Sequence, residues 1–297
     1  MQNKGIIIGN ISNMYLVETL DTNIKIKCTA RGKFKEIKVS PTVGDYVQFE
    51  TLDENKCVGV INEILDRSSY IKRPKLANLT QLCFVISMKM PKPDLLMLDK
   101  QLAFAELNKL KSIICLNKID LVDENYTEEI AEIYSKIGYP VIKLNAKSGE
   151  GIEKLKEFFK NNITAFSGNS GVGKSTLINN IFSDDIALEG NISAKNKKGK
   201  NTTTNTYLYK IDKTSYIADT PGFSTFDISE IPSEELYTYF IDLKKYESDC
   251  EFVGCTHIKE EHCGIKYALE RGDISKSRYD NFQKIYLELK DKEAHKW

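Results

Sequence analysis

The first part of the chain alternates apolar and polar residues in short runs. Residues 24–28, 46–49 and 58–64 place apolar side chains at every second position, which is the period of a strand with one buried face. Turn-forming residues separate these runs at 21–23 and 43–45. About five short strands in so short a stretch fit a small Greek-key β-barrel of the OB type. An SH3-like barrel or a solvated β-face fits the same pattern nearly as well.

The apolar pattern changes further along the chain. Short, nearly continuous apolar runs at 112–116, 141–144, 163–166 and 215–218 predict strands buried in an α/β sheet. Residues 175–182 place their apolar side chains on one side of a helix. Near the C-terminus, apolar residues at helical spacing among charges predict an amphipathic helix that packs on its own domain. These residues are Tyr279, Phe282, Ile285, Tyr286 and Leu289.

A glycine-rich segment follows the run at 163–166. From 168 to 175 it reads Gly-x-x-x-x-Gly-Lys-Ser, and a strand, a loop and a helix are the setting in which this motif binds nucleotide phosphates. The glycines let backbone N–H groups turn toward phosphate oxygens, Lys174 would bridge the β- and γ-phosphates, and Ser175 would ligate Mg²⁺. A glycine turn with a surface lysine is the simpler alternative. The expected phosphate-binding residues are Gly168, Asn169, Ser170, Gly171, Val172, Gly173, Lys174, Ser175 and Thr176.

Two motifs earlier in the chain predict a guanine-binding site. An Asn-Lys-x-Asp tetrad follows one strand and an Asn-Ala-Lys motif follows the next, so both lie where open α/β sheets bind ligands. The Asp120 carboxylate can accept two hydrogen bonds from the guanine N1–H and amine groups. Asn117 would contact guanine N7 and brace the phosphate loop, the stem of Lys118 would pack along the base, and Ala146 would donate its backbone N–H to it. The tetrad alone would be a surface loop, but the second motif favours the guanine site. The expected base-binding residues are Asn117, Lys118, Asp120, Asn145, Ala146 and Lys147.

Two later segments would respond to the γ-phosphate. Asp219 ends a β-run and would hold Mg²⁺ through water, while the Gly222 N–H would sense the γ-phosphate. A basic stretch at 195–201 precedes the threonines at 202–204, one of which would complete the Mg²⁺ shell; a solvated lysine loop fits this stretch as well. Phe223 stands where Ras-like proteins carry the glutamine that orients water, so intrinsic hydrolysis should be slow. The residues expected to act in catalysis are Lys174, Ser175, Thr203, Asp219 and Gly222.

The order of these motifs differs from that of a conventional GTPase. Both base-reading motifs come before the phosphate loop, and the threonines and an Asp-Thr-Pro-Gly turn come after it. In a conventional GTPase the phosphate loop comes first. The same elements in a rotated order predict a circularly permuted α/β P-loop GTPase domain, which the chain enters and leaves beside the segment that senses the γ-phosphate.

Composition limits how the chain could contact nucleic acid or membranes. The 297 residues include 42 basic and 42 acidic side chains, so any RNA contact must rest on local clusters. We expect one basic cluster in the barrel, with Phe34 available to stack on a base, and a second basic face near the C-terminus. The first comprises Lys25, Lys27, Arg31, Lys33, Lys35 and Lys38, and the second Arg271, Lys276 and Arg278. The chain has no apolar run of membrane-spanning length and opens on no signal peptide, so we expect a cytoplasmic protein that binds no membrane.

Possible metal ligands are grouped near the C-terminus. The spacing C-x4-C-x-H-x5-C from 250 to 263 packs soft ligands as closely as a structural Zn²⁺ site requires, and a reducing cytosol argues against disulfides. His262 could compete as the fourth ligand, and a cysteine-rich loop without metal is the alternative to a zinc site. The expected ligands are Cys250, Cys255, His257 and Cys263.

The barrel, the permuted motif order, the Asp-Thr-Pro-Gly-Phe turn and the Cys, Cys, His, Cys cluster resemble the RsgA (YjeQ) family of circularly permuted GTPases. The resemblance covers essentially the whole chain. It implies an OB-fold RNA-binding domain at 1–68, a permuted GTPase domain at 69–230 and an α-helical zinc-binding domain at 231–297. The family usually has Gly-Arg-His-Thr-Thr where this chain has Gly-Lys-Asn-Thr-Thr at 199–203, so a catalytic role for a histidine there does not carry over.

The resemblance also implies cofactors, partners and a role in the cell. The cofactors are GTP or GDP, Mg²⁺ and one Zn²⁺ per chain, and the partners are the 30S ribosomal subunit and its 16S rRNA, bound by a monomer. In that family the 30S subunit stimulates hydrolysis of GTP to GDP and phosphate, and hydrolysis releases the factor late in subunit maturation. A permuted GTPase that serves the large subunit is one alternative. The other is a binding module in which nucleotide only sets the conformation.

Overall fold

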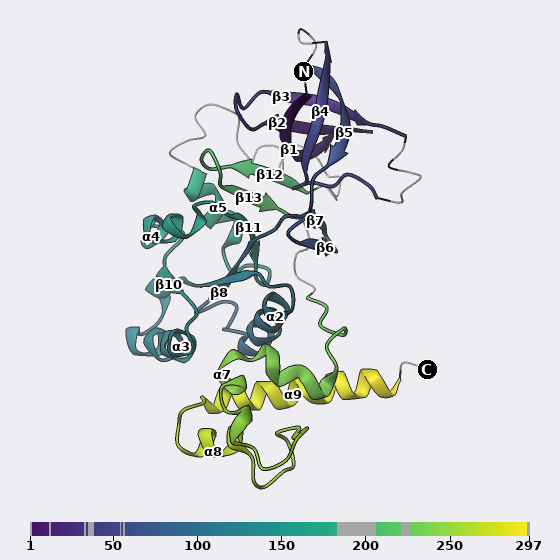
Figure 1. Ribbon diagram of the computed structural model, residues 1–297. Helices are drawn as coiled ribbons and strands as arrows, with labels where there is room; N and C mark the ends of the chain where they lie inside the picture. The colour runs from purple at the N-terminus through teal and green to yellow at the C-terminus, as the bar shows by residue number, and fades with distance from the viewer. Residues whose placement is uncertain are drawn as a thin grey trace. The chain divides into compact units, whose positions relative to one another are not determined.

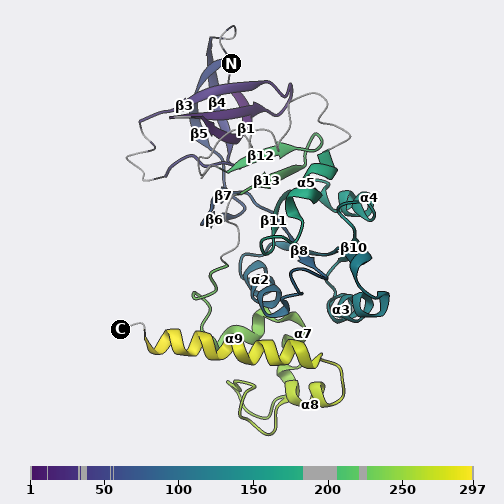
Figure 2. The ribbon, with the colours of Figure 1, turned by 180° about the vertical axis from the view of Figure 1, so that it is seen from behind.

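The computed structural model describes residues 2–11, 13–32, 34, 39–53, 55, 57–182, 206–220 and 226–295. The chain divides into two compact units. The first comprises Met1–Cys83, Ile152–Ser167 and Lys174–Phe223, and the second comprises Phe84–Gly151, Gly168–Gly173 and Ser224–Trp297. Figure 2 shows the ribbon of Figure 1 from behind. The three domains expected from the sequence have other boundaries, and that division stays a prediction.

The first unit begins with a closed β-barrel (Figure 1). Its strands are β1 (Gln2–Ile11), β2 (Met14–Thr19), β3 (Lys25–Ala30), β4 (Tyr46–Asp53) and β5 (Val58–Ile64). They pair in the order β1-β2-β3-β5-β4, with β3 and β5 parallel and the other pairs antiparallel. The long β1 closes the barrel because it pairs with β4 and with β2. The OB-type barrel predicted from the alternating pattern is confirmed.

The barrel interior is filled by alternate residues of its strands, among them Val47, Phe49 and Ile61, which are fully buried. Phe34 is also buried. The expectation that its ring is available to stack on a base is therefore wrong, because the ring is removed from solvent. Of the expected basic cluster, Arg31 forms an ion pair with Glu50 at 3.6 Å, while Lys33, Lys35 and Lys38 lie outside the described residues.

Within the first unit, the barrel contacts a hairpin made of β12 (Tyr207–Lys210) and β13 (Tyr216–Asp219). The buried Glu18 carboxylate on β2 accepts hydrogen bonds from Lys210 Nζ at 2.7 Å and from the Tyr216 hydroxyl at 3.2 Å. At Gly9, a Cβ atom would lie 2.6 Å from the Tyr207 ring, so only glycine permits this approach. These contacts place the barrel against the strand that ends in Asp219.

The rest of the first unit supplies the phosphate-loop strand and the helix that follows the loop. Its elements are β6 (Tyr70–Lys72), β7 (Lys75–Ala77), α4 (Ile152–Lys156), η2 (Glu157–Phe159), β11 (Ile163–Ser167) and α5 (Lys174–Phe182). β11 runs parallel to β13, with Ala165 opposite Ala218. The expected helix at 175–182 is confirmed as α5.

The second unit carries the base-reading motifs. Its first elements are α2 (Leu95–Leu107), β9 (Lys111–Asn117), η1 (Ile119–Leu121), α3 (Glu124–Ile137) and β10 (Val141–Leu144), preceded by β8 (Gln81–Ser87), whose last residues belong to it. β9 and β10 are parallel, and β9 lies between β10 and β8 in the sheet. The strands predicted at 112–116 and 141–144 are confirmed.

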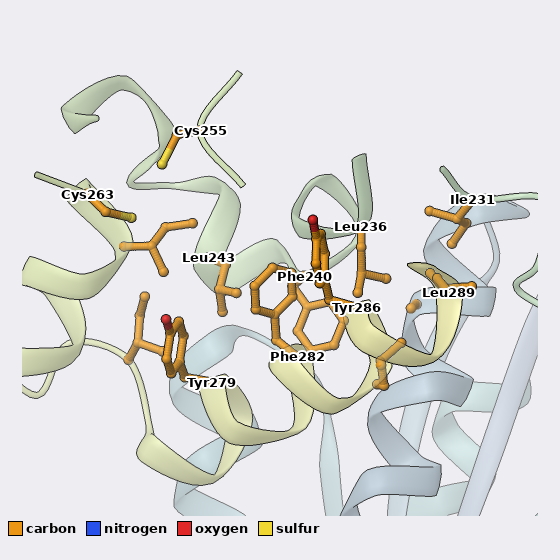
Figure 3. Close-up of a cluster of buried hydrophobic side chains, with 14 of the residues drawn as sticks. Ile231, Leu236, Phe240, Leu243, Cys255, Cys263, Tyr279, Phe282, Tyr286 and Leu289 are labelled. Atoms are coloured by element: carbon orange, nitrogen blue, oxygen red, sulfur yellow. The ribbon is translucent and has the colours of Figure 1, made fainter. Parts of the chain in front are cut away.

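The same unit ends in short helices around one long helix. They are η3 (Ser233–Tyr239), α7 (Ile241–Lys244), η4 (Glu247–Asp249), α8 (Gly264–Glu270) and α9 (Lys276–Ala294). The apolar face of α9 packs on η3 and belongs to one buried cluster with residues of α7 and with Cys255 and Cys263 (Figure 3). Tyr279, Phe282, Ile285, Tyr286 and Leu289 are all buried, so the predicted amphipathic helix does pack on its own domain.

Arg278 lies inside this unit rather than on a basic face. Its guanidinium donates to Asp99 on α2 and to Asp242 on α7, each at 2.6 Å, and its side chain is 1% exposed. Asn281 and Tyr134 also donate to the Asp99 carboxylate, at 2.7 and 2.9 Å. Burial raises the pKa of Asp99, and the guanidinium opposes that shift. The expectation that Arg278 lies on a basic face is therefore wrong: a buried charge needs partners, and those partners bind α9 to α2.

Candidate nucleotide site and cysteine–histidine cluster

The phosphate loop takes its form from glycines at positions that other residues would not fit. Gly168, Gly171 and Gly173 all have positive φ angles, of 148°, 78° and 101°. A Cβ atom would lie 2.3 Å from the Val85 carbonyl oxygen at Gly168 and 2.3 Å from Asn117 Nδ2 at Gly173. Any larger residue would push these neighbours away. The loop backbone is thus set for the close approach of phosphate oxygens that the motif predicts.

Asn117 joins the phosphate loop to both base-reading motifs. It is 2% exposed, and its Nδ2 donates to the Val172 carbonyl at 2.7 Å. Its Oδ1 accepts from the backbone N–H groups of Lys118 and Ala146, at 2.8 and 2.9 Å. The structure thus has the expected brace on the phosphate loop. The Ala146 N–H that we expected to contact the base donates to Asn117, a link that the motifs alone do not show.

Lys118 also spans two loops. It has a left-handed backbone, with φ 64°, and its Nζ donates to the Gly171 carbonyl at 2.7 Å and to the Met90 carbonyl. The side chain thereby lies across the outside of the phosphate loop. The contact of the Lys118 stem with the base stays a prediction.

The remaining base-reading residues lie in turns at the ends of β9 and β10. Asp120 lies in η1 and is exposed. Asn145 Oδ1 accepts from the Lys147 N–H at 3.0 Å and from the Ser148 N–H at 3.3 Å, which closes the turn that buries Ala146. The Asp120 carboxylate is therefore exposed to a ligand, whereas the Asn145 side chain is hydrogen-bonded to the backbone of its own turn.

Replacement of Asp120 by asparagine should shift the preference of the site from guanine toward xanthine nucleotides. An amide can donate to the xanthine O2, whereas it loses the double acceptor that the carboxylate offers to guanine. Competition between GDP and XDP for the purified variant measures this, with Asp123→Asn as a control because Asp123 caps α3 at its Asn125 N–H. Unchanged GDP affinity in the Asp120 variant would remove that residue from the site.

The first unit contains Lys174, the first residue of α5, and Asp219, the last residue of β13. Because β11 and β13 are parallel neighbours, Asp219 lies at the carboxyl edge of the sheet, where the phosphate loop also begins. Burial raises the pKa of the Asp219 carboxyl and lowers the pKa of the Lys174 ammonium. A bound cation would lower the pKa of Asp219 again, and a bound phosphate would raise the pKa of Lys174 again. Ser175 and Thr176 are exposed at the start of α5.

Two of the expected catalytic residues, Thr203 and Gly222, lie outside the described residues, as does Phe223. Their roles stay predictions.

The four expected metal ligands come together in the second unit. Their ligand atoms all lie within 4.8 Å of one another. His257 Nδ1 is 3.5 Å from Cys250 Sγ and 3.4 Å from Cys263 Sγ, and the two sulfur atoms are 3.9 Å apart. A tetrahedral zinc site with ordinary bond lengths has ligand separations of about 3.6–3.8 Å. The residues therefore fit Zn²⁺, with His257 bound through Nδ1.

His262 does not compete for this position. It is exposed, and its Nδ1 is hydrogen-bonded to the Tyr267 hydroxyl at 2.9 Å. His257 is buried, and Tyr279 on α9 donates to its carbonyl at 2.7 Å. Burial raises the pKa of the Cys255 thiol to about 12, so a cation among the ligands is what would favour the thiolate.

Glu260 holds the loop of the cluster and was not among the residues expected from the sequence. Its carboxylate accepts from the Thr256 N–H at 3.0 Å, the Thr256 hydroxyl at 2.8 Å and the Ile258 N–H at 3.1 Å. Burial alone would raise its pKa, but these donors lower it to about 2. A glutamate within three residues of a metal-binding histidine was the available signal. It did not reveal that the carboxylate turns inward.

The phosphate loop, the base-reading turns and the strand order of the sheet define a circularly permuted P-loop GTPase with an N-terminal β-barrel. Comparison with known proteins agrees with this class. Residues 64–229 match the RsgA GTPase family and residues 4–61 match the RsgA N-terminal domain. The chain belongs to the RsgA GTPase family, and it is a GTP hydrolase.

Relatives and solved structures match nearly the whole chain. The "Small ribosomal subunit biogenesis GTPase RsgA" of Ruminiclostridium cellulolyticum is 40% identical, with 97% of this chain and 94% of that protein covered. The protein of the same name from Clostridium botulinum strain Loch Maree is 39% identical over 99% of this chain and 100% of its own. The crystal structure of YjeQ from Thermotoga maritima matches with a TM-score of 0.85 at 39% identity, over 97% of this chain and 99% of that one. YloQ, described as a circularly permuted GTPase, matches with a TM-score of 0.82 at 33% identity, over 98% of this chain and 96% of that one.

The helices of the described residues include none that is both long and apolar enough to cross a bilayer.

Proposed function

We propose that this GTPase assists late maturation of the 30S ribosomal subunit. It binds the subunit and its 16S rRNA in the GTP state, and it leaves after hydrolysis to GDP and phosphate. The observation that carries this proposal is the end-to-end likeness, at about 40% identity, to relatives named for small ribosomal subunit biogenesis. We place the protein in the cytoplasm and expect it to act as a monomer.

We assign the roles in the nucleotide site as follows. Asp120 selects guanine, Asn117 holds the base-reading turns against the phosphate loop, and Lys174 neutralises charge on the β- and γ-phosphates. Ser175 and Asp219 hold Mg²⁺, which stabilises the charge that develops on the transferred phosphoryl group. The hydrolytic water lacks an evident orienting glutamine, since Phe223 follows the Asp-Thr-Pro-Gly turn. The 30S subunit would orient the hydrolytic water, so hydrolysis would be slow in the absence of the subunit.

The Cys/His cluster would hold one Zn²⁺ as a structural ion. All four ligand positions are filled by protein atoms, with no open position for a substrate. The ion would join the loop at 250–263 to the helical core around α9.

The proposed activity is tested by GTP hydrolysis under multiple turnover with purified 30S subunits, with 50S subunits, or with neither. We expect stimulation by 30S alone. Stimulation by 50S would favour service to the large subunit. An unchanged rate in every mixture, together with nucleotide-dependent binding to 30S, would favour a binding module in which turnover is incidental.

Binding to 30S should be tighter with a non-hydrolysable GTP analogue than with GDP. A ligand shifts a two-state equilibrium only by its differential affinity for the two states, and we expect the ~1–3 kcal/mol typical of allosteric coupling. By reciprocity, 30S should raise the affinity for the analogue by the same factor. Both affinities are measured at one salt concentration because phosphate contacts are salt-sensitive. Equal 30S affinity in the two nucleotide states would contradict release by hydrolysis.

A further inference from the structure

The loop between the first two cysteines of the cluster exposes apolar side chains at its tip. Val253 is 107% exposed, the largest value for any large apolar residue in the described part of the chain, and Phe252 beside it is 54% exposed. Scattered single apolar residues on a surface are ordinary. Two neighbours at the end of a projecting loop are better suited to insertion into a partner, where the apolar surface would leave water.

This loop is held in place by its base. Cys250 and Cys255 bring their sulfur atoms into the cluster. The Glu251 N–H donates to the His262 carbonyl at 3.2 Å, and the Cys255 N–H donates to the Phe252 carbonyl at 3.3 Å. A loop fixed at both ends presents its tip with little loss of conformational entropy on binding.

The charge around the tip is acidic. Residues 247–262 include five acidic side chains and one basic side chain, Lys259. The acidic residues are Glu247, Asp249, Glu251, Glu260 and Glu261. A Zn²⁺ bound by three thiolates would carry a net charge of −1, so the metal would not reverse the sign. RNA phosphates would be repelled here, whereas lysine and arginine side chains would be attracted.

The basic residues that follow the cluster are bonded to groups of the protein itself. Lys266 donates to the Glu260 carbonyl at 2.8 Å. Arg278 is buried between two carboxylates, and Arg271 and Lys276 form ion pairs with Asp273 and Asp280 at 2.9 Å. The partner that fits this surface is thus a positively charged protein with an apolar pocket.

We propose that Glu251, Phe252 and Val253, here called the cluster tip, dock on a lysine- and arginine-rich protein of the small ribosomal subunit and not on its RNA. The apolar pair fills a pocket on that protein, and the acidic rim pairs with its basic residues. This inference rests on the proposed function. It adds that the C-terminal part of the chain reads a protein surface of the subunit.

The first test compares the affinity of full-length variants for 30S subunits and for protein-free 16S rRNA, with one GTP analogue at one salt concentration. The double variant Phe252→Ser/Val253→Ser should bind 30S about tenfold more weakly, as for loss of an interface anchor, and should bind protein-free rRNA as the wild type does. Leu287→Ser is the matched control, because Leu287 is 59% exposed on α9, outside the loop. Zinc content and GTP hydrolysis without subunits should be unchanged in both variants.

The second test uses the sign of a charge effect. Glu251→Lys should weaken binding to 30S if the partner is a basic protein, whereas a partner made of RNA would bind this variant more tightly. The inference is overturned by tighter 30S binding of Glu251→Lys, by unchanged 30S binding of the double variant, or by an equal loss for protein-free rRNA. Failure of the wild type to bind 30S would reject the proposed function itself, and the inference with it.

Discussion

Lys174→Ala should abolish measurable GTP hydrolysis. Lys174 begins α5 directly after the loop glycines, and partial burial lowers the pKa of its ammonium, so the folded protein holds this charge at a cost that bound phosphate would offset. Loss of one preorganised group that stabilises transition-state charge typically slows an enzyme by about 10²–10³-fold. We therefore expect subunit-stimulated turnover to fall by at least about this factor, together with weaker GTP binding.

Single-turnover hydrolysis and GTP affinity, measured with and without 30S, check this result. Lys160→Ala serves as a control because Lys160 is an exposed lysine of the same unit, and that variant should behave as the wild type. Ser175→Ala should give a similar loss through the Mg²⁺ ligand, with a higher Mg²⁺ concentration required for half-maximal rate. Normal stimulated turnover in both the Lys174 and the Ser175 variants would mean that the phosphate-loop assignment is wrong.

Cys255→Ser should release one zinc ion per chain and unfold the loop at 250–263. Binding of a structural zinc contributes about 10–16 kcal/mol in small zinc modules, which is more than hydrogen bonds within one loop can replace. The effect should stop at this loop, because α9 also packs on an apolar core and reaches α2 through Arg278. We therefore expect α9 to keep slow amide exchange while the loop loses it, and the GTPase part to stay folded.

Metal analysis and hydrogen exchange on protein purified without chelator check this expectation. Cys57→Ser is the matched control, because Cys57 belongs to the first unit and should leave the zinc content at one per chain. Absence of metal in the wild-type protein, or a full complement of zinc in Cys255→Ser, would reject the site.

Much of the fold follows from local patterns. The period-two runs predicted β3, β4 and β5, the apolar runs predicted β9, β10 and β11, and the helical spacing at the C-terminus predicted α9. These patterns are informative because side chains alternate in a strand and repeat every 3.6 residues in a helix, so a buried face marks the sequence directly. The expected site residues of the second unit also lie at the ends of the strands that the sequence predicted.

Other features depend on segments far apart in the sequence. Phe34 and Arg278 were expected on binding surfaces and are both buried. Arg278 is hydrogen-bonded to two carboxylates that are far from it in the sequence. Asp242 is 36 residues away along the chain and Asp99 is 179 residues away. No local pattern predicts which element will cover an arginine, because the energy of a buried charge depends on partners that become neighbours only in the folded chain.

The sequence by itself determined which motifs this protein carries: the glycine-rich Gly-Lys-Ser loop, the Asn-Lys-x-Asp tetrad, the Cys, Cys, His, Cys spacing and the permuted order in which they occur. Each of these is a local motif whose backbone and ligand atoms are set by a few neighbouring residues. Tertiary structure alone decided that Asn117 also accepts a hydrogen bond from the Ala146 N–H, that His262 lies outside the cluster, and that Arg278 binds α9 to α2. Those outcomes depend on burial and hydrogen bonding between distant segments, because a side chain's environment forms only when the chain has folded.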